Sequence, residues 1–416
     1  MISCGIDFGT TNSAIAISKS AQDIRLVSIE GSEPTLPSAI FFPAAGHTLF
    51  GRAATKAFFT GEEGRYMRSL KRILGSSLMD HGTVVNGKMR KFDDIIGSFL
   101  SLLKSKAEAE AGKTLDHVVI GRPVHFLDHD PGADSLAQEQ MTRTARKTGF
   151  RHIEFQFEPI AAAFAHEIHL TSEKLALVID IGGGTSDFTV IRLSRDNLAK
   201  PDRSGDILGN SGTRLGGNDL DKSLSLAAFM PSFGYRTTYG DKKLEVPLSW
   251  FHELSEWSKV NFLYTPKLKN EIHAVLQESH APRELGRYAK IIKMEAGHRL
   301  LSAVEQAKID LTEQEKTTAS LAFIEDGLDI GVSRSLLEQA ISGHIEKIAA
   351  TISDCLALAE VQQNQIELIV LTGGPTETPL IKQLIRKKFP AAAVSEENKL
   401  SSVALGLGYD SQRRFG

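Results

Sequence analysis

One pattern occurs twice in this chain of 416 residues, and it constrains the fold more than any other feature. The first copy, GIDFGTTNSAIAI, runs from Gly5 to Ile17, and the second, LVIDIGGGTSDFTVI, runs from Leu177 to Ile191. In each copy an apolar, β-type run leads into an aspartate, glycine and hydroxyl residues, and another β-type run follows. Each copy therefore predicts a β-hairpin, and the repetition predicts a duplicated architecture.

The glycines of the second copy indicate a ligand rather than a turn alone. A turn needs one or two glycines, whereas Gly182 to Gly184 leave successive backbone N–H groups open as a nest for an anion. The hydroxyls of Thr185 and Ser186 would be further donors. Asp180 and Asp187 would face the same ligand, and carboxylates beside a polyphosphate require a divalent cation such as hydrated Mg²⁺ between them. The alternative is a tight turn with solvated aspartates.

The first copy offers the same groups at the other end of the chain. Asp7 ends an apolar run, and Gly9, Thr10, Thr11 and Asn12 follow it. Each half of the molecule would thus supply one phosphate-binding hairpin. A nucleotide would be held between the two.

A third glycine pair lies in ELIVLTGGPTETPLIKQLI, from Glu367 to Ile385. Here a buried-type strand runs into Gly373 and Gly374 and then into a helical pattern. A strand that leads into a helix start suits an adenosine or a phosphate.

These motifs together resemble the superfamily of actin, sugar kinases and heat-shock chaperones, and specifically the nucleotide-binding domain of the DnaK-type heat shock protein 70 family. Four further segments match that family in its order along the chain: LKRILG (70–75), FEPIAAAFAHE (157–167), TRLGGNDLD (213–221) and AVEQAKIDLT (303–312). The resemblance covers nearly the whole chain. It implies an α/β protein with the duplicated actin-like ATPase fold, which is ribonuclease H-like, and two lobes around a nucleotide cleft.

The resemblance also implies Mg²⁺-dependent hydrolysis of ATP to ADP and phosphate. The catalytic residues would be Lys71, Glu158, Asp180 and Thr185, and Asp7 and Asp180 would hold Mg²⁺ through water. The nucleotide would contact Gly9, Thr10, Thr11, Asn12, Gly182, Gly183, Gly184, Thr185, Gly216, Gly217, Glu305, Lys308, Thr312, Gly373, Gly374, Pro375 and Glu377. A site of amides, one cation and acids suits phosphoryl transfer, because positioning and charge neutralisation do most of the work there.

Two of these assignments have a simpler alternative. Lys71 lies in a Lys-Arg pair on an expected loop, where a lysine is ordinarily solvated. Glu158 comes directly before Pro159 at a helix start, where an acid is ordinary capping chemistry.

Some positions depart from the family pattern. The family usually has serine, threonine and then arginine after the third glycine pair, and the arginine packs on adenine. Pro375 and Glu377 occupy two of those places here, so we expect weaker adenine affinity, by about 1 kcal/mol for a lost cation–π contact. Asn218 replaces a common glutamate, and Leu400 falls near the place of an acid.

The chain ends at YDSQRRFG, so we expect no linker and no peptide-binding domain, as in the short YegD-like relatives of these chaperones. The final helix should return to lobe I, which would comprise 1–170 and 396–416. Lobe II would comprise 171–395, with a mostly helical insertion at about 221–311. Its aromatic cluster WFHELSEWSKVNFLY (250–264) predicts a subdomain core, or alternatively an exposed surface for a partner.

Composition argues against several classes of protein. A net charge of −3 gives no basic footprint for nucleic acid or an anionic membrane, and no apolar run is long enough for a membrane helix. Two cysteines, Cys4 in an expected strand and Cys355 in an expected helix, indicate a reducing compartment. With no basic leader before Asp7, we expect a cytoplasmic protein.

Three motifs are discounted as sites. AEAEAGKTLD (107–116) ends like a Walker A motif, but Ala107 replaces the required glycine. The preceding segment, DDIIGSFLSLLKSKAEAEAG (93–112), has helical spacing, and we expect this helix to end at Gly112. His166 and His169 are three residues apart, not four as in the zincin motif, and His117, His125 and His129 have no ligand spacing.

Other functions remain open at this stage. A sugar-kinase-like phosphotransferase shares the hairpins but needs a general base, for which no additional aspartate motif is found. An ATP-sensing protein that closes on its nucleotide without hydrolysis, or an actin-like filament, is compatible with the same motifs. The main hypothesis is a slow ATPase whose nucleotide state switches its affinity for a protein partner or co-chaperone.

Overall fold

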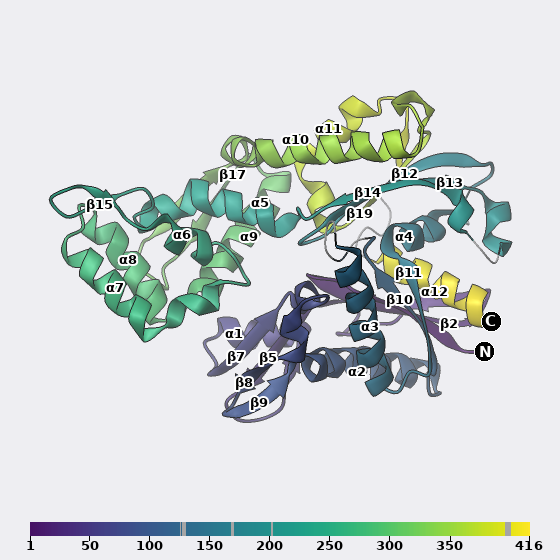
Figure 1. The fold of residues 1–416 in the computed structure, drawn as a ribbon, viewed down its shortest axis with the longest axis horizontal. Helices are drawn as coiled ribbons and strands as arrows, with labels where there is room; N and C mark the ends of the chain where they lie inside the picture. Colours follow the sequence, from purple (N-terminus) through teal and green to yellow (C-terminus); the bar gives the residue numbers. More distant parts are fainter. Residues whose placement is uncertain (125, 127–129, 168–169, 201–202, 396–400) are drawn as a thin grey trace. The chain divides into compact units, whose positions relative to one another are not determined.

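The computed structural model describes residues 1–124, 126, 130–167, 170–200, 203–395 and 401–416 (Figure 1). It divides into two compact units, which are described separately below. The first unit comprises Met1–Gly216, Ile348–Thr376 and Leu384–Gly416, and the second comprises Gly217–Lys347 and Glu377–Gln383.

The first sheet of unit one contains the N-terminal hairpin. Its order is β11-β10-β1-β2-β3, with β4 also paired to β2. β1 and β2 are antiparallel, and β10 runs parallel to β1 and to β11. The strands are β1 (Ser3–Phe8), β2 (Asn12–Ser20), β3 (Asp23–Leu26), β4 (Thr35–Pro37), β10 (His117–Arg122) and β11 (His152–Phe157).

The second sheet of unit one contains the glycine-rich hairpin and repeats the plan of the first. Its order is β14-β13-β12-β19-β20, with β12 antiparallel to β13 and parallel to β19. In both sheets a hairpin has an antiparallel neighbour on one side and two parallel strands on the other, so the predicted duplication is confirmed. The strands are β12 (Lys174–Ile181), β13 (Ser186–Leu193), β14 (Ile207–Thr213), β19 (Leu368–Thr372) and β20 (Ala393–Ser395).

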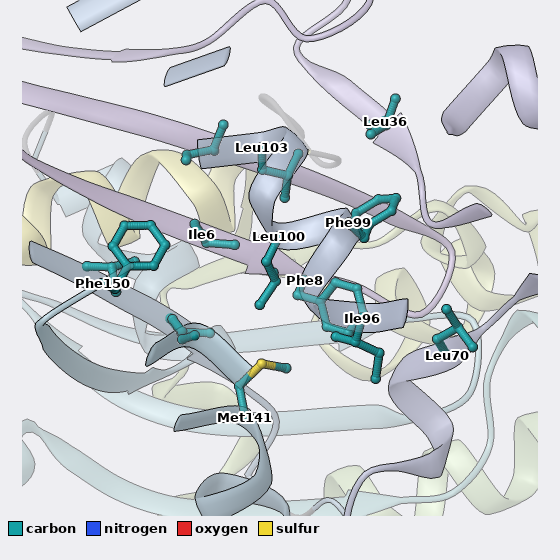
Figure 2. Packing of buried hydrophobic residues seen from close by; sticks show 14 of the residues in the cluster. Ile6, Phe8, Leu36, Leu70, Ile96, Phe99, Leu100, Leu103, Met141 and Phe150 are labelled. Atoms are coloured by element: carbon teal, nitrogen blue, oxygen red, sulfur yellow. The ribbon is translucent and has the colours of Figure 1, made fainter. Parts of the chain in front are cut away.

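Two helices pack with the first sheet to form an apolar core. They are α2 (Phe92–Ala111) and α3 (Pro131–Lys147), and α2 ends at Gly112 with φ 70°, as the sequence predicts. The rings of Phe8 and Phe99 lie 5.8 Å apart. Figure 2 shows residues of this core, which include Ile6, Phe8, Leu70, Ile96, Phe99, Leu100, Leu103, Met141 and Phe150.

Two further helices pack closely against each other, and one of them also packs against the first sheet. α4 (Glu158–Glu167) and α12 (Ser402–Phe415) pack together, and α12 also lies against β1, β2 and β10 (Figure 1). A Cβ on Gly406 would overlap the carbonyl oxygen of Ala161. The final helix therefore returns to the N-terminal sheet, as predicted.

The remaining elements of unit one are short. Unit one also contains the C-terminal parts of two helices whose N-terminal parts belong to unit two. The shared helices are α10 (Arg334–Leu358) and α11 (Pro379–Lys388). The strands and the small helix are β5 (Ala39–Pro43), β6 (Leu49–Phe50), α1 (Gly51–Phe59), β7 (Gly64–Arg68), β8 (Gly82–Val85) and β9 (Lys88–Lys91). Short 3-10 turns span Leu70–Ile73, Ser77–Asp80, Arg195–Ala199, Ser204–Asp206 and Gln363–Gln365.

Unit two is mostly helical, as the predicted insertion requires. Trp250, Phe251 and Trp257 are buried, which confirms the core interpretation of the aromatic cluster, although Phe262 is 72% exposed. The helices are α5 (Gly217–Leu224), α6 (Leu248–Leu254), α7 (Pro266–Gln277), α8 (Pro282–Lys293) and α9 (Gly297–Glu313). A π-helical segment spans Ser225–Phe229, and 3-10 helices span Met230–Phe233 and Val260–Tyr264. Two hairpins complete it: β15 (Thr238–Tyr239) with β16 (Leu244–Glu245), and β17 (Lys316–Ser320) with β18 (Asp329–Ser333).

The compact units do not follow the expected lobe boundaries. Both sheets belong to unit one, and the division falls between Gly216 and Gly217. The boundaries of the two lobes therefore stay a prediction. Within the described ranges, no helix is both long and apolar enough to span a membrane. Cys4 in β1 and Cys355 in α10 are buried and form no disulfide.

Candidate functional site

The turn of the glycine-rich hairpin is closed by its own backbone and backed by a second segment. The Gly182 N–H donates to the Thr185 carbonyl oxygen at 2.9 Å. A Cβ on Gly216 would lie 2.5 Å from the Gly184 nitrogen and 2.6 Å from the Gly182 carbonyl oxygen, so only glycine fits there. The buried Ser186 hydroxyl donates to the Leu215 carbonyl at 2.6 Å, so the expectation that it would serve an anion is wrong.

Gly373 lies against the end of the same hairpin. It has φ 84°, and a Cβ there would lie 3.3 Å from Oδ1 of Asp180 and would overlap the Ile181 carbonyl oxygen. The Thr376 hydroxyl closes the following turn by donating to the Gly373 carbonyl at 2.6 Å. A 3-10 turn, Gly374–Glu377, intervenes before α11 begins at Pro379, so the helix starts later than the glycine pair suggested.

The N-terminal hairpin turn is supported from β4 and β5. The Ser38 hydroxyl donates to the Gly9 carbonyl at 2.7 Å, and the Ser38 N–H donates to the Thr11 carbonyl at 2.8 Å. A Cβ on Gly9 would overlap the carbonyl oxygen of Asn12, which explains the glycine. Gly9 to Asn12, including Thr10, stay partly exposed at the end of the hairpin.

Lys71 and Glu158 form an ion pair close to the ends of both hairpins. The ammonium group of Lys71 donates to Oε1 of Glu158, and the two side chains are 10% and 12% exposed. The simpler interpretation of Lys71 as a solvated surface lysine is therefore wrong. Glu158 is the first residue of α4, so the helix start places its carboxylate opposite the lysine.

Three acids, Asp7, Glu158 and Asp180, interact electrostatically with one lysine at this site. Burial raises the pKa of Asp7 to about 8, and repulsion from Glu158 and Asp180 adds to this effect while Lys71 opposes it. Burial also raises the pKa of Asp180, with repulsion from Glu158 and from Asp187, its partner across the hairpin. Burial lowers the pKa of Lys71, but attraction to Glu158 and Asp7 outweighs it and the net shift is upward.

This donor set fits a hydrated divalent cation. Asp7 and Asp180 repel each other, and among the described residues Lys71 supplies the compensating charge, so a cation between them would remove that repulsion. Across the described residues, no group of three or more His, Cys, Asp or Glu is arranged to ligate a metal directly. Two carboxylates that act through water are the form of site that Mg²⁺ commonly takes.

The apolar core fixes the position of Lys71. It follows Leu70, which is buried in the same cluster as Phe8, the residue directly before the turn of the N-terminal hairpin (Figure 2). Ser69 adopts the left-handed conformation with φ 60°, which turns the chain into the 3-10 turn Leu70–Ile73. The lysine turn and the N-terminal hairpin are therefore anchored in one core.

Two residues that the sequence did not single out also contact this site. A Cβ on Gly121, at the end of β10, would lie 3.1 Å from Cγ of Glu158, so glycine leaves room for that carboxylate. Arg72 lies against Gly184: a Cβ there would be 3.4 Å from its Nε. The adjacency of Arg72 to Lys71 in LKRILG was a signal that could have identified it.

Three of the residues expected to contact the nucleotide lie in α9 of unit two. Glu305, Lys308 and Thr312 share one face of α9, as residues three and four apart on a helix do. Lys308 is buried and pairs with the buried Asp221 of α5 at 2.7 Å. The Thr312 hydroxyl donates to the Ile309 carbonyl at 2.7 Å, and Gly217 is the first residue of α5.

The acid that departs from the family pattern is neutralised locally. Oε2 of Glu377 accepts from Nζ of Lys382 at 2.7 Å, one turn further along the chain in α11. Pro375 lies within the preceding 3-10 turn. Leu400, another departure, lies outside the described residues.

The discounted motifs have ordinary structural surroundings. α2 extends through Ala111, so the segment before Gly112 is helical, as predicted for the false Walker A motif. His117 stacks on His152 with ring centroids 4.2 Å apart. His166 lies in α4, and His125, His129 and His169 lie outside the described residues.

Comparison with known proteins gives a consistent family match. A family model described as Hsp70 protein matches residues 3–240 and 284–410, which is most of the chain. The chain is 29% identical over 415 residues to chaperone protein DnaK of Mycoplasmoides gallisepticum, covering 97% of this chain and 58% of that protein. It is 27% identical over 393 residues to chaperone protein DnaK of Elusimicrobium minutum, covering 92% and 52%. The chain therefore spans about half the length of these curated relatives.

Proposed function

The chain belongs to the Hsp70 protein family, and on that premise we propose that it binds ATP and ADP with Mg²⁺ and slowly hydrolyses ATP. The family has the actin-like ATPase fold, in agreement with the duplicated sheets. The observation that carries the proposal is the ion pair between Lys71 and Glu158, with Asp7 and Asp180 beside it.

The two hairpin turns would hold the phosphates. The Gly182 N–H closes the second turn, so the N–H groups of Gly183 to Thr185 and of Gly9 to Asn12 would donate to phosphate oxygens, and the glycines allow close approach. Asp7 and Asp180 would hold hydrated Mg²⁺, which neutralises phosphate charge when bound.

Lys71 and Glu158 would then perform the chemistry of the reaction. The Lys71 ammonium would stabilise the charge on the transferred phosphoryl group. The Glu158 carboxylate would orient a water molecule and accept its proton, while the ion pair keeps both groups in fixed positions. A nucleophilic side chain is not required, because water is the acceptor.

The biological use of this cycle would be a switch. The nucleotide state would change the closure of the molecule around its ligand and so its affinity for a protein partner, such as a co-chaperone, in the cytoplasm. A protein that binds ATP without hydrolysis, or that transfers phosphate to a sugar, would use the same hairpins differently.

Calorimetric titration with ATP and Mg²⁺, followed by a phosphate-release assay on the same samples, tests the proposal. The variant Asp180→Ala removes one metal-holding carboxylate, and Asp354→Ala, on the exposed face of α10, is its control. We expect binding and release in the wild type and the control, and loss of both in Asp180→Ala. Binding without release would favour an ATP sensor, and phosphate found on a sugar would favour a kinase. No binding at all would overturn the proposal.

A further inference from the structure

The 3-10 turn Leu70–Ile73 presents two cations with different surroundings. Leu70 anchors the turn in the core, and Lys71 pairs with Glu158. Arg72, the next residue, is exposed, and its backbone N–H donates to the Ser69 carbonyl at 3.1 Å. One turn therefore carries a paired lysine and an arginine that points elsewhere.

Arg72 reaches the turn of the glycine-rich hairpin. A Cβ built on Gly184 would lie 3.4 Å from Nε, 3.6 Å from Cδ and 3.7 Å from Cζ of Arg72. The guanidinium thus lies on the Cβ side of Gly184, the third glycine of the turn, directly before Thr185.

The guanidinium has no anionic partner in the part of the chain that the structure describes. No ion pair or side-chain hydrogen bond involves Arg72 there, although the nearby acids Glu158 and Asp180 are close to the neighbouring Lys71. An arginine presents five N–H donors in a planar fork that matches phosphate oxygens in pairs. Beside a turn in which the Gly182 N–H is used but Gly183 to Thr185 follow, a fork of this kind could add side-chain donors to backbone donors for an anion.

We propose that Arg72 binds the terminal phosphate of ATP at the glycine-rich hairpin, separately from Lys71. This inference rests on the proposed function and deepens it. ADP lacks that phosphate, so Arg72 determines how strongly the protein prefers ATP to ADP. Lys71, tied to Glu158, serves the reaction itself.

The test compares Arg72→Gln and Arg72→Lys with Arg192→Gln, a matched control on the exposed face of β13. Calorimetry would measure the affinities for Mg·ADP, for a Mg²⁺ complex of ATP with a non-hydrolysable β,γ-imido bridge, and for tripolyphosphate. We expect Arg72→Gln to bind the ATP analogue about tenfold or more weakly, the loss of a charge-assisted contact, while ADP affinity changes less than about threefold. Arg72→Lys should fall between, because it keeps the charge without the fork.

The outcomes separate the inference from the function on which it rests. If the wild type binds both nucleotides and Arg72→Gln binds them equally well, only the inference is overturned. An equal loss of ADP and ATP-analogue affinity would also overturn it, since a merely structural role would affect both. If the wild type binds neither nucleotide nor tripolyphosphate, the proposed function fails and the inference fails with it.

Discussion

The ammonium group of Lys71 and the carboxylate of Glu158 form a hydrogen-bonded ion pair in which both side chains are nearly buried. The lysine comes from a turn anchored by Leu70, and the acid from the first residue of α4. Each partner fixes the other, so both are presented in one orientation. The two acids Asp7 and Asp180 interact electrostatically with this pair, and burial together with repulsion from Glu158 raises the pKa of both.

The first prediction concerns Lys71. Lys71→Met should lower the rate of phosphate release from ATP by at least about 100-fold, because it removes the cation that stabilises the transferred group. Binding of ADP should persist, since the hairpin turns are unchanged. A single-turnover phosphate-release assay beside an ADP titration measures both quantities.

Lys113→Met is the control for this change, because Lys113 is an exposed lysine in the loop after α2. It should release phosphate at the wild-type rate. Full activity of Lys71→Met would exclude a catalytic role for the lysine.

The second prediction concerns the acid at the third glycine pair. Glu377→Arg should raise ADP affinity by about fivefold, as expected for about 1 kcal/mol from a cation–π contact with adenine. The matched variant Lys382→Gln breaks the pair with Glu377 but adds no arginine, so it should not raise the affinity. Equal ADP affinity of Glu377→Arg and the wild type, in the same calorimeter, would show that this position does not meet the base.

The third prediction concerns the contact of α12 with α4. Gly406→Ala should lower the free energy of unfolding by about 1–3 kcal/mol or more, because its Cβ would overlap the Ala161 carbonyl oxygen. Thermal unfolding followed by circular dichroism measures the loss. Gly97→Ala, in α2 of the same unit, is the control, since its Cβ would meet nothing closer than 3.6 Å and alanine favours a helix. Similar melting of the two variants would contradict the packing described here.

The sequence predicted the parts of the fold that depend on short, continuous segments of the chain. Both hairpins, the start of α4 at Glu158 and the end of α2 at Gly112 follow from glycines, aspartates and apolar runs within about 15 residues of each other. The family resemblance placed Lys71 and Glu158 in one catalytic site, but their ion pair was not predicted, because 87 residues separate them and no local pattern joins them.

Contacts between distant segments were beyond the sequence. Ser186 looks like a ligand donor in the motif, yet its hydroxyl serves the Leu215 carbonyl, which no local spacing reveals. The approach of Arg72 to Gly184 depends on how the core sets the 3-10 turn relative to the second sheet. The sequence also did not predict which aromatic side chains are exposed. Phe262 belongs to the aromatic cluster by sequence, yet its side chain is exposed to solvent.

The last prediction concerns the pH dependence of unit two. Hydrogen bonds from Arg287, at 2.5 Å and 3.0 Å, and from Arg283, at 2.6 Å, lower the pKa of Glu325 from 4.5 to about 2. Because the folded pKa is the lower one, this stabilisation is complete above the unfolded pKa and is lost as the pH falls toward the folded pKa. Glu325→Gln should therefore unfold at lower urea concentration than the wild type near neutral pH, and the difference should shrink between about pH 5 and about pH 2.

Tryptophan fluorescence can follow this transition selectively, because the two tryptophans of the chain, Trp250 and Trp257, are both buried in unit two. The control is Glu313→Gln, an exposed acid at the end of α9 in the same unit. It should change the urea midpoint little at any pH, because no arginine in the described part of the chain pairs with that carboxylate. A difference between wild type and Glu325→Gln that stays constant down to about pH 2 would mean that the two arginines do not stabilise the ionised form of Glu325.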